Sequence, residues 1–271
     1  MKIRIGRFEF TECWDGVLYK NLSAYPAITE WELQSLCNCI AYEAANGRAC
    51  EIEADESIQR ELEEYRKEYE SGRRVPVPQK LTECTACPKY RGCLTDLVCH
   101  TASAEDAISI LKSGRLLSAV RARGLDAAAL KAEARNAAND PEDFFHYVMF
   151  AWGNCQAGDR LVVERQLGRF PNNDDLKAGF IPGVRFFFRY DELSHHPRAV
   201  FDGVHPVKVR DEVVLADNEC AIIVPEMHLE AIETHVPEAL TARVHYLSSD
   251  DLDIWEWSAK AYEFARGVLS H

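Results

Sequence analysis

The spacing of hydrophobic and polar positions changes several times along the 271 residues, and each change marks an expected element. Residues 2–10 alternate between the two kinds, which predicts an edge strand. Thr29 and Glu32 form a capping box ahead of a helical pattern that continues to about Asn46. Residues 55–71 carry many oppositely charged pairs at helical spacing, so they predict a helix with a solvated, charged face.

The pattern after residue 99 predicts helices first and strands later. Helical periodicity over 103–112 and 126–138 is followed by short apolar runs that Gly, Pro, Asn and Asp separate. These runs predict strands at 146–152, 161–164, 184–190, 204–209, 220–224 and 242–247. An amphipathic pattern over 250–269 predicts a last helix. Because the elements do not alternate regularly and no internal repeat is visible, the expected fold class is α+β.

Two units are expected on either side of a linker. Residues 72–80 hold two prolines and three basic residues, which is typical of a linker. We therefore expect residues 1–95 to form a small helical, Cys-rich module and residues 96–271 to form an α+β domain. A chain of this length can bury two such cores.

Charge is distributed unevenly over a chain whose formal net charge is −13. Residues 1–99 carry a net charge of −4, residues 100–189 a net of +1 and residues 190–271 a net of −10. The acid excess argues against a protein that coats nucleic acid, whereas the middle third can receive an anionic ligand. No apolar run approaches the roughly 18 residues of a membrane span, and the start lacks a signal-peptide pattern. We therefore expect a cytoplasmic protein with no membrane partner.

Ten cysteines are present, and eight of them fall within the first 99 residues. Without an export signal, disulfides are a poor explanation, because the cytoplasm keeps thiols reduced. Cys84, Cys87, Cys93 and Cys99 have a spacing that suits four thiolate ligands, of either zinc or an iron–sulfur cluster. Two alternatives stay open: some of these cysteines are small buried apolar residues, or His100 replaces Cys99 as the fourth ligand.

The other cysteines form a weaker set. Cys37 and Cys39 lie two positions apart on an expected helix and do not share a face, so core burial is expected for both. Cys50 is grouped with them by proximity alone, and the isolated Cys155 and Cys220 are also expected to be buried.

Two polar segments have the composition of binding loops, namely residues 152–165 and 195–205. Asp202 and His205 lie three positions apart across an expected turn, so they are candidates for a metal site or an acid/base pair. The alternative is that Asp202 makes an Asx turn.

A scattered set of motifs resembles the ADP-ribosyltransferases of the DarT-like kind. The first motif is His100-Thr101, followed by Ile110-Leu111, Gly114 and Leu116. His146-Tyr147-Val148-Met149-Phe150 looks like the Tyr-Val-aromatic strand of this family. Asn218-Glu219, followed by the apolar run that ends in Val224-Pro225, is similar to its late strand.

The resemblance implies a split β-sheet core that binds NAD. It assigns contact with the adenosine ribose to His100, with Thr101 beside it, and contact with the nicotinamide to Tyr147. Glu219 would contact the nicotinamide ribose, where a carboxylate stabilises the oxocarbenium-like state as the glycosidic bond breaks. The family also has an active-site arginine, for which Arg121, Arg123 and Arg135 are candidates and Arg123 is preferred. Two alternatives stay open: Tyr147 is a residue of the hydrophobic core, and Glu219 is an ordinary carboxylate in a turn.

The leading hypothesis is an NAD-dependent ADP-ribosyltransferase-like enzyme with NAD as its substrate and a nucleobase or a protein side chain as acceptor. The second hypothesis is a non-enzymatic regulator in which the cysteines at 84–99 bind a metal or an iron–sulfur cluster. The third is an RNA 2′-phosphotransferase-like enzyme, a different nucleotide enzyme that also uses NAD.

Overall fold

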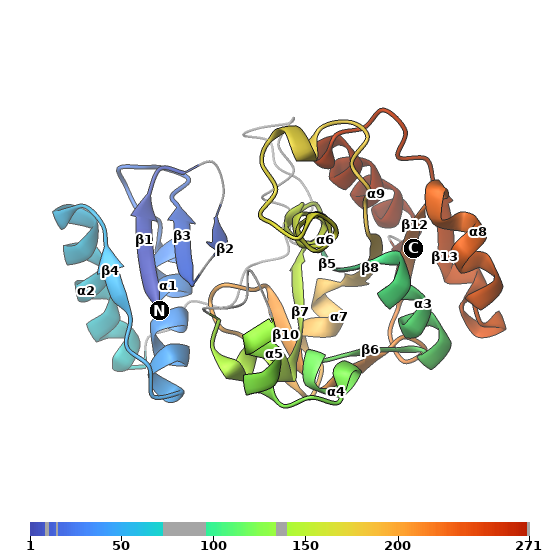
Figure 1. Cartoon of the computed structure of the whole chain (residues 1–271). Coiled ribbons are helices and arrows are strands. Elements are labelled where there is room, and N and C mark those ends of the chain that lie inside the picture. The colour runs from blue at the N-terminus through green and yellow to red at the C-terminus, as the bar shows by residue number, and fades with distance from the viewer. Residues whose placement is uncertain (9–10, 15, 73–95, 134–139, 270–271) are drawn as a thin grey trace.

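The computed structural model describes residues 1–8, 11–14, 16–72, 96–133 and 140–269. These residues form a mixed α+β structure with two main β-sheets, as the sequence predicts at the level of fold class. The first sheet belongs to residues 1–72 and the second to residues 96–269 (Figure 1). We call these two parts the first unit and the second unit.

The first unit is a four-stranded sheet with two helices, and it is therefore less helical than expected. The strands β1 (Lys2–Gly6), β2 (Glu12–Trp14), β3 (Val17–Asn21) and β4 (Glu51–Glu53) lie in the order β2-β3-β1-β4. Strand β1 is parallel to both of its neighbours, and β2 and β3 are antiparallel. The expectation of a helical module is corrected here. The strand predicted within residues 2–10 is present as β1, but it lies inside the sheet and not at its edge. The other strands have three to five residues and are too short to give a clear period.

The two helices of the first unit begin and end close to where the sequence predicts. In α1 (Glu30–Ala45), the predicted capping box is confirmed: the Thr29 hydroxyl accepts from the Glu32 amide, and the Glu32 carboxylate accepts from the Thr29 amide. In α2 (Glu56–Glu70), Ile58 and Leu62 are buried. The charged helix therefore turns an apolar stripe toward the core of this unit.

The second unit is built on a seven-stranded sheet in the order β13-β12-β8-β5-β7-β10-β9. Its strands are β5 (Leu97–Ala102), β7 (Tyr147–Trp152), β8 (Val184–Arg189), β9 (Ala199–Val200), β10 (Val207–Arg210), β12 (Cys220–Pro225) and β13 (Val244–Leu247). Five of these strands lie within or overlap the runs from which strands were predicted. The pair β12–β13 is parallel, and the other neighbours are antiparallel.

Strand β7 lies between β5 and β10 and pairs with each of them over a different part of its length. Its last two residues, Ala151 and Trp152, pair with β5, whereas residues 147–150 pair with β10. On the other side, β5 pairs with β8 over its full length. Strands β5 and β7 therefore diverge after Cys99, and we call this point the fork.

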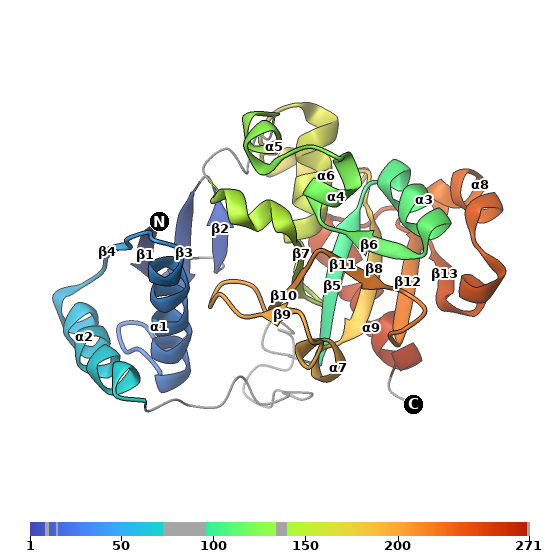
Figure 2. The same ribbon diagram turned by 90° about the horizontal axis from the view of Figure 1, so that it is seen from below.

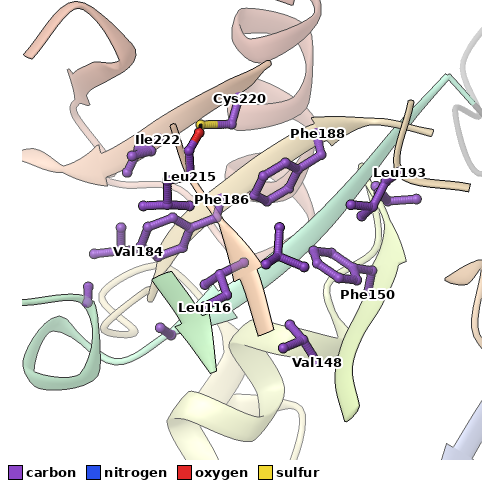
Figure 3. Close-up of a cluster of buried hydrophobic side chains, with 14 of the residues drawn as sticks. Leu116, Val148, Phe150, Val184, Phe186, Phe188, Leu193, Leu215, Cys220 and Ile222 are labelled. Carbon is purple, nitrogen blue, oxygen red and sulfur yellow. Dashed lines mark hydrogen bonds between the residues drawn. The ribbon is translucent and has the colours of Figure 1, made fainter. Parts of the chain in front are cut away.

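Two layers cover the second sheet. The three consecutive phenylalanines of β8 alternate between them, because successive side chains of a strand point to opposite faces. Phe187 packs with α9 (Ile254–Leu269), including the fully buried Trp257. Phe186 and Phe188 pack on the other face with Leu116 of the two-stranded sheet β6 (Arg115–Leu117) and β11 (Glu212–Val214) (Figures 2 and 3).

The remaining helices are α3 (Ala104–Ser113), α4 (Ala119–Arg123), α5 (Ala127–Glu133), α6 (Ala157–Leu167), α7 (Tyr190–Ser194) and α8 (Leu229–Ile232). The predicted helix at 103–112 is confirmed, and the helix predicted at 126–138 is present as α5, with residues 134–139 outside the described part. The strand predicted at 161–164 is wrong, because these residues lie within α6. None of the helices in the described ranges is long and apolar enough to cross a membrane.

The two units contact each other through the loop between β9 and β10, which reaches α1 (Figure 2). Ser35 of α1 donates a hydrogen bond of 2.8 Å to the Gly203 carbonyl. Asp143, from the second unit, accepts hydrogen bonds from Tyr42 and, at 2.7 Å, from Arg48. The first unit therefore lies against the β7–β10 side of the larger sheet.

Candidate functional site

His100 lies at the fork, on the first residue of β5 after the pairing with β7 stops. Its Nδ1 atom is 3.1 Å from the Met149 carbonyl of β7, and its ring is 6.0 Å from that of Phe150. Because a carbonyl only accepts hydrogen bonds, Nδ1 carries the proton. The imidazole therefore links the two diverging strands.

Burial lowers the pKa of His100, and Arg165 of α6 acts in the same direction. The bond to Met149 and the Asp106 carboxylate oppose this shift, without reversing it. The ring is consequently neutral at neutral pH, with its proton on Nδ1 and the lone pair of Nε2 ready to accept. A ribose hydroxyl is the kind of donor that such a nitrogen binds.

The side chain of Thr101 lies on the opposite face of β5. There it packs against two glycines: a Cβ added at Gly183 would lie 2.6 Å from its Cγ2, and one added at Gly158 of α6 would collide with its Oγ1. The structure therefore does not bring the Thr101 side chain beside the imidazole of His100. The Thr101 side chain instead lies where α6 packs closely against β5.

Tyr147 belongs to a second cluster, built around the fully buried Lys208 of β10. The Lys208 ammonium lies 4.1, 4.0 and 4.7 Å from the ring centroids of Tyr42, Phe144 and Tyr147. We call these three rings with Lys208 and Asp202 the Lys208 enclosure. A cation over aromatic rings is stabilised by their negative faces.

Charge inside the Lys208 enclosure is balanced by Asp202. One carboxylate oxygen lies 2.9 Å from Lys208 Nζ and 2.9 Å from Nδ1 of His205. The other oxygen accepts from the backbone amides of Val204 and His205, which confirms the Asx-turn interpretation. Although burial alone would raise the pKa of Asp202, His205 and Lys208 hold it well below its usual value.

Glu219 lies just before β12, with a side chain that is 52% exposed and an ion pair of 3.5 Å to Arg189. Its backbone amide donates to the Glu192 carboxylate at 3.2 Å. Together with Asp191, these residues line an open depression of about 400 Å³. Along the register of β12, β8 and β5, Glu219 is two strands across and three residues along from His100, so their Cα atoms are about 14 Å apart.

The preferred arginine, Arg123, ends α4 beside Gly124. Helix α4 packs against β6 and against the segment Glu142–His146 that precedes β7. Nearby, Arg121 and Arg115 converge on Glu212 of β11, at 3.1 and 2.9 Å. Arg135 lies outside the described residues.

Cys99 is buried in β5, and burial raises the pKa of its thiol to about 12. Arg185 opposes this shift, but the thiol stays protonated at neutral pH. Cys84, Cys87 and Cys93 lie outside the described residues, so joint ligation of a metal stays a prediction. Within the described ranges, no group of three or more His, Cys, Asp or Glu side chains is arranged to hold a metal.

A buried ion pair near the fork was not predicted from the sequence. Arg185 of β8 and Asp159 of α6 are both fully buried, with Arg185 Nε 2.9 Å from the carboxylate. The same guanidinium donates to the Gly153 and Cys155 carbonyls, and Asp159 accepts from the Gly183 amide at 2.8 Å. An arginine within the apolar run of β8 was the available signal. The pair fixes the loop that joins β7 to α6.

No protein-family model, curated protein or solved structure matches the chain.

Proposed function

We propose that the protein is an NAD-dependent ADP-ribosyltransferase-like enzyme. The observation that carries this proposal is the position of His100 at the fork, with Nδ1 held by the Met149 carbonyl. A neutral imidazole fixed in this way offers Nε2 to a hydroxyl of the adenosine ribose. The divergence of β5 and β7 after Cys99 is compatible with the split sheet that the resemblance implies.

Glu219 would act at the other end of the dinucleotide. The register places His100 on the face of Phe186 and Glu219 in line with Ala221 on the opposite face, so a ligand that contacts both residues would have to pass around the end of the strands. As the bond between nicotinamide and the ribose breaks, positive charge develops on the sugar, and the Glu219 carboxylate stabilises it. The ribose carbon then bonds to the acceptor, and nicotinamide leaves. Arg189, paired with Glu219 in this structure, would supply a cation for the pyrophosphate.

The test is release of nicotinamide from NAD by the full-length protein, together with NAD affinity by calorimetry. We expect His100→Ala to weaken NAD binding by about tenfold, since a lost hydrogen bond costs roughly 1.4 kcal/mol. Glu219→Gln is expected to retain binding but to lose turnover by about 100-fold or more. Glu226→Gln, on the short segment Glu226–His228 after β12, is the matched exposed control and should leave both unchanged.

Absence of NAD binding by the wild-type protein at millimolar NAD would refute the proposal. Turnover that Glu219→Gln leaves intact would refute the role of Glu219. Release of 2′-phosphate from RNA, rather than transfer of ADP-ribose to a nucleobase or protein, would identify the phosphotransferase alternative.

A further inference from the structure

Three arginines of the second unit converge on one carboxylate at the corner between β10 and β11. Arg115 of β6 and Arg121 of α4 each place Nη1 near the same oxygen of Glu212, at 2.9 and 3.1 Å. Arg198, which directly precedes β9, has guanidinium nitrogens 3.5 Å from the other Glu212 oxygen and 3.5 Å from the Asp211 carboxylate. We call these five residues the arginine cluster.

The main chain fixes the corner that carries the two carboxylates. The Asp211 amide donates to the His146 carbonyl at 2.9 Å, and the Asp211 carbonyl accepts from the Ser118 amide at 2.7 Å. Ser118 immediately precedes α4, the helix that carries Arg121. Strand β11 is in turn paired with β6, the strand that carries Arg115. The backbone therefore holds the attachment points of these cations close together, independently of their ion pairs.

Positive charge is in excess in the arginine cluster, although the chain as a whole has a net charge of −13. Three guanidinium groups share two carboxylates, so one net positive charge remains. The hydrogen bond from Arg115 is the largest cause that lowers the pKa of Glu212, and burial opposes it, so Glu212 is ionised at neutral pH. The arginine side chains are 40–47% exposed, whereas that of Glu212 is 16% exposed. The cations are thus open to solvent and the carboxylate that gathers them is more deeply placed.

Donors also remain for a further anion. A guanidinium group carries five N–H donors in a planar fork. Within the described ranges, the guanidinium groups of Arg115 and Arg121 form ion pairs only with Glu212, each through Nη1. A phosphate group offers three acceptor oxygens and about two negative charges, and its geometry matches the guanidinium fork.

We infer that the arginine cluster binds a ligand that carries a phosphate monoester or a pyrophosphate group. Glu212 holds the guanidinium groups from the protein side, and the ligand accepts from their remaining N–H groups on the solvent side. This binding does not depend on the proposed NAD site, where the cation for the pyrophosphate is Arg189. The cluster is therefore a second anion site of the same unit.

The test is calorimetric titration of the full-length protein with inorganic pyrophosphate in the absence of NAD. We expect saturable binding that weakens as the salt concentration rises. Arg121→Ala and Arg198→Ala should each lower the affinity by about tenfold or more, because each removes a hydrogen bond between charged groups. Arg165→Ala is the matched control, since this exposed arginine lies 3.3 Å from a single carboxylate, that of Asp106, and its loss should leave the affinity unchanged. Arg189→Ala should also leave it unchanged.

Two sources of the phosphate group are separated by displacement of the bound pyrophosphate. Displacement by adenosine diphosphate identifies a free nucleotide, whereas displacement only by an oligonucleotide with a 5′-phosphate identifies a nucleic-acid end. Circular dichroism checks that each variant is folded, and wild-type binding with its two control variants decides the outcome for a variant that is not. Failure of the wild-type protein to bind pyrophosphate, or binding that is lost in Arg189→Ala and kept in folded Arg121→Ala, would overturn the inference. Neither result bears on NAD turnover, so the proposed function is tested separately.

Discussion

Lys208 and Asp202 are both fully buried, and their charged groups lie 2.9 Å apart within a wall of three aromatic rings. The residue that completes this wall, Tyr42, comes from the first unit and accepts a hydrogen bond of 2.9 Å from Lys208 Nζ. Burial of a lysine is costly unless an anion and hydrogen bonds compensate it. The pair therefore makes the stability of the second unit depend on a helix of the first.

Removing the negative charge of Asp202 should destabilise the protein strongly. In Asp202→Asn, Lys208 is left buried without an anionic partner, and we expect a loss of about 3 kcal/mol in the free energy of unfolding. Urea denaturation followed by circular dichroism measures this loss. His205→Gln is the control, because it leaves the Lys208–Asp202 contact in place and should cost about 1 kcal/mol. An Asp202→Asn variant as stable as wild type would show that the ion pair contributes nothing.

The Lys208–Asp202 ion pair should also make the stability of the protein depend on pH. The pKa of Asp202 is well below its ordinary value of 3.8 in the folded protein, so its contribution is fully present above that value. It should be lost progressively as the pH falls below about 4, because the unfolded chain then binds the proton more readily. The stability difference between wild type and Asp202→Asn should therefore be larger at about pH 5 than at about pH 2. Urea titrations at a series of pH values provide the comparison.

Gly203 is expected to tolerate no side chain. It has a φ of +73°, and an added Cβ would meet the backbone of Ser35 and Cys39 on α1. Gly203→Ala should cost about 1 kcal/mol in backbone strain and a further 1–3 kcal/mol or so in overpacking. Gly124→Ala is the matched control, since Gly124 has a φ of +64° but nothing within 4 Å of an added Cβ. Equal midpoints of thermal unfolding for the two variants would contradict a close contact between the units at Gly203.

Local signals predicted those elements whose ends or faces are encoded in neighbouring residues. The capping box at Thr29 and Glu32 marked the start of α1, and the helical periodicity over 103–112 predicted α3. The strand predicted at 161–164 was wrong because a short apolar run occurs both in strands and in buried helical turns. The strands β2 and β4 have three residues each and give no period to detect.

The candidate site was predictable only in part. The motifs singled out His100, but the fork depends on pairing between distant segments, because β7 pairs with β5 only at Ala151 and Trp152. The Lys208 enclosure was not predicted, because Lys208 and Tyr42 are 166 residues apart. A lysine between the buried Val207 and Val209 was the one local clue, and it does not reveal the partner.

The Tyr42 contact means that the boundary between the units is not an energetic boundary. A fragment that begins at residue 96 would keep Lys208 and Asp202 but would lose one of the three rings around them and the hydroxyl that accepts from Lys208. Water would then reach the charges of Lys208 and Asp202, which are buried in the intact chain. The first unit thus acts as a piece of the second unit's interior that happens to be encoded at the other end of the chain, and the two parts are expected to unfold together.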